Sequence, residues 1–178
     1  MSSNIQRDEG AGFVGEITVS LFDVATLESR YSNWSQLPKD RRLELLKADG
    51  DRPDPYRVIE QENLILNSFL EQFAAGETDL PLLALGDSAV TPDETNTELN
   101  SEVWRTAVGQ DEPSGSVRLT STLLSQNEAN GESIVEIGFH DGTRLLTHAI
   151  LSPGERIDEK TASDTATIDY SIRHERAD

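Results

Sequence analysis

Three histidines are the first residues in this chain to test for chemistry. His140 stands beside an Asp-Gly pair, His148 lies within an apolar run, and His174 is near the C-terminus. No two of them have the HxH or HxxxH spacing that places two imidazoles on one metal ion. The sequence therefore predicts structural or solvated histidines and no metal site.

Four acids stand in one polar stretch, within the segment LALGDSAVTPDETNTELNSEVWRTAV at 83–108. Adjacent carboxylates can act as an acid–base pair or hold a cation, but the spacing of Asp87, Asp93, Glu94 and Glu98 fits no calcium loop. The chain also lacks the Gly-x-Ser-x-Gly nucleophile motif and a phosphate-binding glycine loop. We therefore expect no catalytic residue, no cofactor and no enzymatic activity.

Two tryptophans leave a binding role open. Trp34 and Trp104 could offer flat platforms to a sugar, although a lone tryptophan in a strand more often packs in a core or an interface. Asn33-Trp34-Ser35 is also a glycosylation sequon. A sugar-binding module is thus one alternative reading of the sequence.

Charge is the extreme feature of the composition. The 33 acids outnumber the 15 lysines and arginines, which gives a net charge of −18, and only three of the basic residues are lysines. Such a surface argues against nucleic acid and against an anionic membrane as partners. Abundant acids with scarce lysine are typical of proteins in concentrated salt, where a Debye length of about 3 Å screens repulsion. We therefore expect a protein that works in concentrated salt.

The chain contains no cysteine, which excludes disulfides and thiolate chemistry. No apolar run approaches the roughly 20 residues of a membrane span, and the first residues lack the apolar stretch of a signal peptide. We therefore expect a protein that is made in a cytoplasm.

Alternating apolar residues predict the strands that must position these side chains. Strands are expected at 15–23, 57–65, 80–87, 101–109, 115–124, 133–153 and 166–175. The range 133–153 predicts a hairpin, because Asp141-Gly142 favours a two-residue turn.

Helical signals are short. Leu43 and Leu46 suggest an amphipathic helix within 35–55, and Asn67 and Gly76 suggest the cap and the stop of another. Capping-box spacings at 95–98 and 125–128 each predict a single turn. The sum favours an antiparallel β-sandwich with one or two short helices. Residues 13–178 form the single expected domain, with a helical or irregular insertion at about 32–56, and residues 1–12 form a flexible or docking arm.

Five segments follow one another in a recognisable order. They read GEITVSLFD, NLILNSFLEQFA, LALGDSAVTPDETNTELNSEVWR, NEANGESIVEIGFHDGTRLLTHAILSP and EKTASDTATIDYSI. In this order the chain resembles the tail-fibre, tail-collar and baseplate structural proteins of tailed viruses. The resemblance covers nearly the whole chain, but residues 32–56 are longer than the pattern requires.

The resemblance implies a structural component of a virion tail, in the baseplate or at the tail-fibre attachment. Its partners would be other tail proteins and copies of itself, as a trimer or a multiple of one. The matched positions are structural, and the residues we expect at the interface are Trp34, Trp104, Arg105, Asp87 and Pro92. A head decoration or turret protein of the same virion remains an alternative.

Overall fold

A computed structural model describes residues 12–48, 50–77, 79–114 and 117–175. The predicted arm at 1–12 lies outside these residues except for Gly12, which opens the first strand. The strands are β1 (Gly12–Asp23), β2 (Arg57–Ile65), β3 (Leu82–Gly86), β4 (Glu102–Ala107), β5 (Gln110–Ser114), β6 (Val117–Leu124), β7 (Glu136–His140), β8 (Leu145–Ile150) and β9 (Asp164–Glu175). The helices are α1 (Val24–Arg30), the 3-10 turn η1 (Trp34–Gln36), α2 (Lys39–Lys47) and α3 (Asn67–Ala74).

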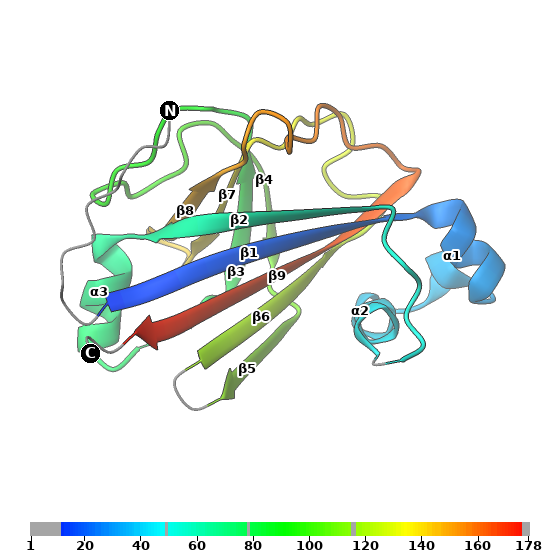
Figure 1. Ribbon diagram of the computed structural model, residues 1–178, viewed down its shortest axis with the longest axis horizontal. Coiled ribbons are helices and arrows are strands. Elements are labelled where there is room, and N and C mark those ends of the chain that lie inside the picture. The colour runs from blue at the N-terminus through cyan, green and yellow to red at the C-terminus, as the bar shows by residue number, and fades with distance from the viewer. Residues whose placement is uncertain (1–11, 49, 78, 115–116, 176–178) are drawn as a thin grey trace.

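All neighbouring strands run antiparallel in one sheet of order β4-β3-β7-β8-β2-β1-β9-β6-β5. The sheet curls as a half-barrel, so that β3, β4, β7 and β8 pass behind β1, β2 and β9 (Figure 1). The predicted mainly antiparallel β class is confirmed. The two-sheet sandwich is not confirmed, and the described residues hold nine strands and three α-helices, more of each than the sequence analysis predicted.

The main core fills the concave side of the curled sheet. Inward-facing residues of β1, β2 and β9 meet those of β3, β7 and β8 there. Phe139 of β7 stacks on Tyr170 of β9 with ring centroids 4.6 Å apart, although these strands are not neighbours in the sheet. The curl thus lets one sheet bury its own two halves against each other.

A second core lies on the outer face of the sheet, beneath the segment between β1 and β2. Phe22 and Leu123 point outward from β1 and β6, and the helical segment covers them with Leu27, Trp34, Leu43 and Leu46. The predicted insertion is therefore a packed cap, and it begins earlier than residue 32. The sequence analysis missed α1, whose signal was Asp23: its carboxylate accepts the Thr26 N–H at 2.8 Å as an N-cap.

A two-residue link joins the two edges of the sheet. Val108 and Gly109 connect β4 to β5, which stand at opposite ends of the strand order. A Cβ on Gly109 would lie 2.8 Å from a methyl group of Leu43 in α2 and 3.2 Å from the Ser121 carbonyl, so a larger residue at this corner would require Leu43 to shift. The helical cap therefore packs against the corner where the curl brings the two edges together.

Two local predictions are wrong in detail. The β7–β8 hairpin turns over four residues, because His140 pairs with Leu145 and the Asp141 carboxylate accepts the N–H groups of Thr143 and Arg144. Of the Asp-Gly pair, only Gly142 has a positive φ, 103°. Asn67 is the first helical residue of α3 and not its cap.

Two other local predictions are confirmed. Gly76 follows α3 with a φ of 83°. The Gly76 N–H donates to the Phe73 carbonyl and the Glu77 N–H donates to the Gln72 carbonyl, as in a Schellman motif. At 125–128 the Ser125 N–H donates to Glu128 at 2.9 Å, which is half of a capping box.

Candidate interaction surface

The connection between β3 and β4, residues 87–101, is largely exposed yet held at several points. A hydrogen bond joins its two ends: the Asp87 N–H donates to the Ser101 carbonyl at 3.1 Å. Its middle is tied to the rest of the fold, since the Glu94 carbonyl accepts the Asn67 N–H and the Thr97 carbonyl accepts the Leu145 N–H. We call residues 87–101 the anchored loop.

One buried carboxylate fixes the end of the anchored loop. Glu136 of β7 accepts the N–H groups of Asn100 and Ser101 at 3.1 and 2.7 Å, and it bonds His148 of β8 at 2.7 Å. Burial raises the pKa of Glu136, but these hydrogen bonds outweigh burial and hold the pKa below its usual value. Gly86 makes room, because a Cβ there would lie 2.4 Å from the carboxylate.

A second histidine–carboxylate pair holds the loop nearer its middle. The buried His140 accepts the Gly142 N–H at Nδ1, which leaves Nε2 as the donor to Glu98 at 3.2 Å. Arg105 of β4 lies 3.7 Å from Glu98 and binds Glu102 through two hydrogen bonds of 2.8 and 2.6 Å. These side chains tie the loop to the outer face of β4 and β7.

The tip of the loop is stabilised from within. Asp93 accepts the N–H and the hydroxyl of Thr95 at 2.9 and 2.5 Å, and these bonds lower its pKa. Asn96 accepts the Asp93 N–H at 2.8 Å. The predicted capping box at 95–98 is therefore wrong: no helix forms, because Asp93 takes the Thr95 N–H and His140 takes Glu98.

The edge strand β4 borders the anchored loop. In the described part of the chain β4 pairs with β3 alone, so its other side is an open sheet edge. Trp104 is half-buried against the main core, while Arg105 faces the opposite side toward Glu98. The loop and this edge together form the candidate interaction surface.

Four of the five expected interface residues lie in these two segments, and their role at an interface stays a prediction. Asp87 and Pro92 lie in the anchored loop, and Trp104 and Arg105 lie in β4. Trp34 does not belong with them: its side chain is 0% exposed in the second core, close to the Arg42 guanidinium. The sequence analysis also missed Val90, which is 59% exposed in the loop, and the anchors Glu136, His140 and His148.

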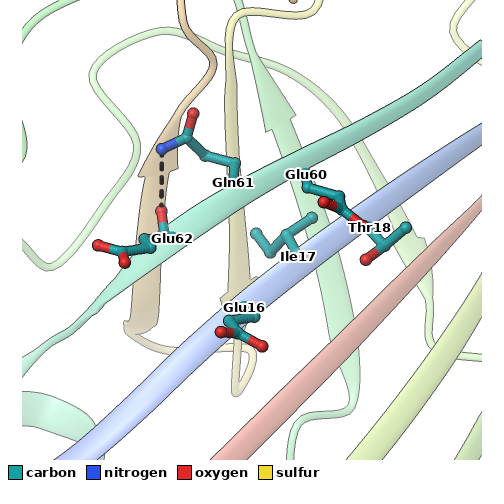
Figure 2. A pocket seen from close by; sticks show the side chains of 6 residues that line it. All are labelled: Glu16, Ile17, Thr18, Glu60, Gln61 and Glu62. Atoms are coloured by element: carbon teal, nitrogen blue, oxygen red, sulfur yellow. Dashed lines mark hydrogen bonds between the residues drawn. The ribbon is translucent and has the colours of Figure 1, made fainter.

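The outer face of β1 and β2 carries a shallow, acidic depression of about 240 Å³ (Figure 2). Its lining includes Glu16, Glu60 and Glu62, and Glu16 stands directly opposite Glu62 in the strand ladder. No group of three or more acids, histidines or cysteines in the described residues is arranged to hold a metal ion. The depression therefore offers negative charge but no coordination site.

The histidines do not assemble a reactive centre with one another. His140 and His148 are buried in separate carboxylate pairs, and the exposed His174 packs its ring against Phe13 at 5.3 Å. None of the three lines the depression in Figure 2. The geometry assigns the first two to holding the anchored loop, as the sequence predicted for structural histidines.

The fold and this surface define an acidic, antiparallel β protein with an ordered loop beside an open sheet edge. No protein-family model, no curated protein and no solved structure was found to match the chain. Among the helices in the described ranges, none is long and apolar enough to cross a bilayer.

Proposed function

We propose that the chain is a structural component of the virion tail of a tailed virus that infects a halophilic host. It acts by protein–protein assembly, in the baseplate or at the tail-fibre attachment, and it has no catalytic role. The observation that carries this proposal is the anchored loop. One end of this long exposed loop is fixed by the buried Glu136, and its middle is tied by backbone hydrogen bonds and by the Glu98–His140 pair. A loop held in this way loses little conformational entropy when a partner binds.

The open edge of β4 supports the same proposal. An unpaired strand edge can add a strand from a neighbour, and proteins that stay monomeric usually cover or charge such edges. Here the charges on β4 are largely neutralised, since Arg105 binds both Glu102 and Glu98. The partners are other tail proteins and further copies of this chain, arranged as a trimer or a multiple of one around the tail axis.

The charge pattern on the strands supports a saline environment. Glu16 and Glu62 face each other across β1 and β2, and like charges in that position repel in dilute salt. In molar salt the Debye length is about 3 Å, so the repulsion is largely screened beyond that distance. A head decoration protein of the same virion would share these features, so the position in the particle must be measured.

We also propose that the two halves of the curled sheet behave as the layers of a sandwich. Among the described strand ladders, the one shared by the two halves is the short β2–β8 ladder, Leu64 with His148 and Ile65 with Thr147. The Val108–Gly109 link connects the halves at the other end. The Phe139–Tyr170 stack packs one half against the other. An experimental structure with a β2–β8 ladder this short would support two layers, whereas a longer ladder would favour a barrel.

The experiment that tests the function is localisation in purified virions. Particles from the host culture would be labelled with an antibody raised against the full chain and viewed by electron microscopy. We expect label at the tail end that carries the baseplate. Label on the head would favour the decoration protein, and absence of the chain from washed particles would refute a virion role.

Glycan binding has weaker support than assembly. Trp34 is buried and Trp104 is half-buried against the core, so neither offers a fully exposed ring face. No described residue pattern favours this role over assembly, and it stays an alternative that a glycan array in molar salt would test.

A further inference from the structure

Helix α3 leaves two large apolar side chains at the surface. Leu70 and Phe73 are 43% and 46% exposed and stand three residues apart, so they share one side of the helix. The half-buried Phe13 of β1 lies beside them, with its ring centroid 4.8 Å from that of Phe73. We call these three residues the α3 face. It lies beside the start of β1 (Figure 1).

The α3 face is held on a firm support. The adjoining side of the helix is buried through Phe69 and Gln72. The Phe69 ring packs edge-on against Phe13 and stacks on Phe73, with ring centroids 6.3 Å apart. The Ser68 hydroxyl donates to the Leu145 carbonyl, and the helix ends in the Schellman motif at Gly76. Exposed apolar groups on a fixed backbone lose little entropy when they are covered.

An exposed ion pair lies at α3, in a chain whose net charge is −18. Glu71 of α3 and Arg144 of the β7–β8 turn form an ion pair of 2.7 Å, and both remain partly exposed. A surface with one acid and one base beside an apolar patch is complementary to itself about a two-fold axis. Glu71 of one copy can then approach Arg144 of another.

We propose that the α3 face is a two-fold contact between copies of this chain. This inference rests on the proposed self-assembly and names its contact surface. The other occupant within reach is the segment 1–11, which precedes Gly12. Its sequence MSSNIQRDEGA offers only Met1 and Ile5 as large apolar side chains, so it matches the patch poorly.

The contact should be weak in isolation and should strengthen with salt. Three apolar side chains are far fewer than the roughly 20–30 residues a side of a standard stable interface. Molar salt screens the repulsion between two strongly acidic copies, and excluded salts favour apolar burial. The pair should therefore form in molar potassium chloride and dissociate in dilute buffer.

The test is sedimentation of the full chain over a concentration series, in dilute and in molar potassium chloride. The surface variant carries Leu70→Ser with Phe73→Ser. Its matched control carries Val58→Ser with Leu119→Ser, which removes two other exposed apolar side chains, 48% and 41% exposed. We expect the first variant to weaken association about tenfold or more, the control to associate as the parent does, and circular dichroism to show both folded.

A charge exchange provides a second variant that does not alter the apolar residues. Glu71→Arg or Arg144→Glu alone should weaken association, and the two together should restore it, because the exchanged charges again meet across the axis. The double exchange also restores the ion pair within each chain, so the deciding sample is a mixture of the two single variants. In the mixture the pair stays broken inside each chain and opposite charges meet only across the axis, so stronger association of the mixture than of either variant alone supports the contact, and equally weak association contradicts it.

Three results would overturn the inference. If the parent associates and the Leu70/Phe73 variant associates equally well, the contact lies elsewhere while self-assembly stands. If the parent stays monomeric in molar salt, the self-assembly in the proposed function fails as well. If removing residues 1–11 increases association through this face, that segment is its normal occupant.

Discussion

Glu136 and His148 meet across the neighbouring strands β7 and β8 through a hydrogen bond of 2.7 Å, and both side chains are 0% exposed. The same carboxylate receives two N–H groups from the end of the anchored loop. A single buried acid thus links the sheet to the surface that we propose for assembly.

Glu136→Gln should destabilise the chain. The glutamine amide cannot satisfy two backbone donors and the histidine at once, and removing one partner of a buried pair costs about 3–5 kcal/mol. Urea unfolding in molar potassium chloride measures the change. Glu159→Gln, at an exposed acid outside the strands, is the control and should change the free energy of unfolding little. An equal effect of both substitutions would contradict the role of Glu136.

The Glu136–His148 pair also predicts how the free energy of unfolding depends on pH. The folded-state pKa of Glu136 lies below the ordinary value of 4.5, so its contribution to stability is complete above pH 4.5. The contribution is lost as the pH falls through the lower, folded-state pKa. The free energy of unfolding of the parent should therefore fall more steeply with acid than that of Glu136→Gln. Parallel pH profiles for the two proteins would show that Glu136 is not linked to folding.

Gly86→Ala should cost about 1–3 kcal/mol, as overpacking of a tight site does. The new methyl group would lie 2.4 Å from the Glu136 carboxylate and 2.6 Å from the Ser101 carbonyl, which is backbone and cannot turn aside. Thermal unfolding compares this variant with Gly154→Ala, where a Cβ meets nothing within 4 Å. We expect the control to keep the melting temperature of the parent.

Trp34→Ala should lower stability by about 3–5 kcal/mol, because it removes the largest side chain of the second core. Val90→Ala, at a position 59% exposed, is the matched control and should be nearly neutral. Urea titrations measure the free energy of unfolding of both variants and of the parent. A nearly neutral Trp34→Ala would mean that the helical cap is not packed as described.

Glu62→Gln should stabilise the chain in dilute salt and have little effect in molar salt. The substitution removes the repulsion with Glu16 across the ladder, worth roughly 0.2–1 kcal/mol. Salt screens that repulsion, so the advantage should disappear as the salt concentration rises. Melting temperatures across a salt series test this, and a constant advantage at all salt concentrations would point to a cause other than charge.

The strand positions could be predicted because each one depends on a short local pattern. Ile17, Val19 and Leu21 alternate with polar residues whatever the rest of the chain does, and all three lie in the main core. The stop at Gly76 likewise depends on one residue with a positive φ. The same local rules missed α1 and β5, which carry no apolar alternation.

The sequence alone thus determined an acidic, mainly antiparallel β protein. Only the tertiary structure decided that Trp34 is buried, that the strands form one curled sheet, and that Glu136, His140 and His148 hold the loop. The reason is distance along the chain: Glu136 lies 36 residues from Asn100 and 12 from His148. Contacts of that separation depend on how the strands pair, and a local pattern of residues does not specify which strands become neighbours.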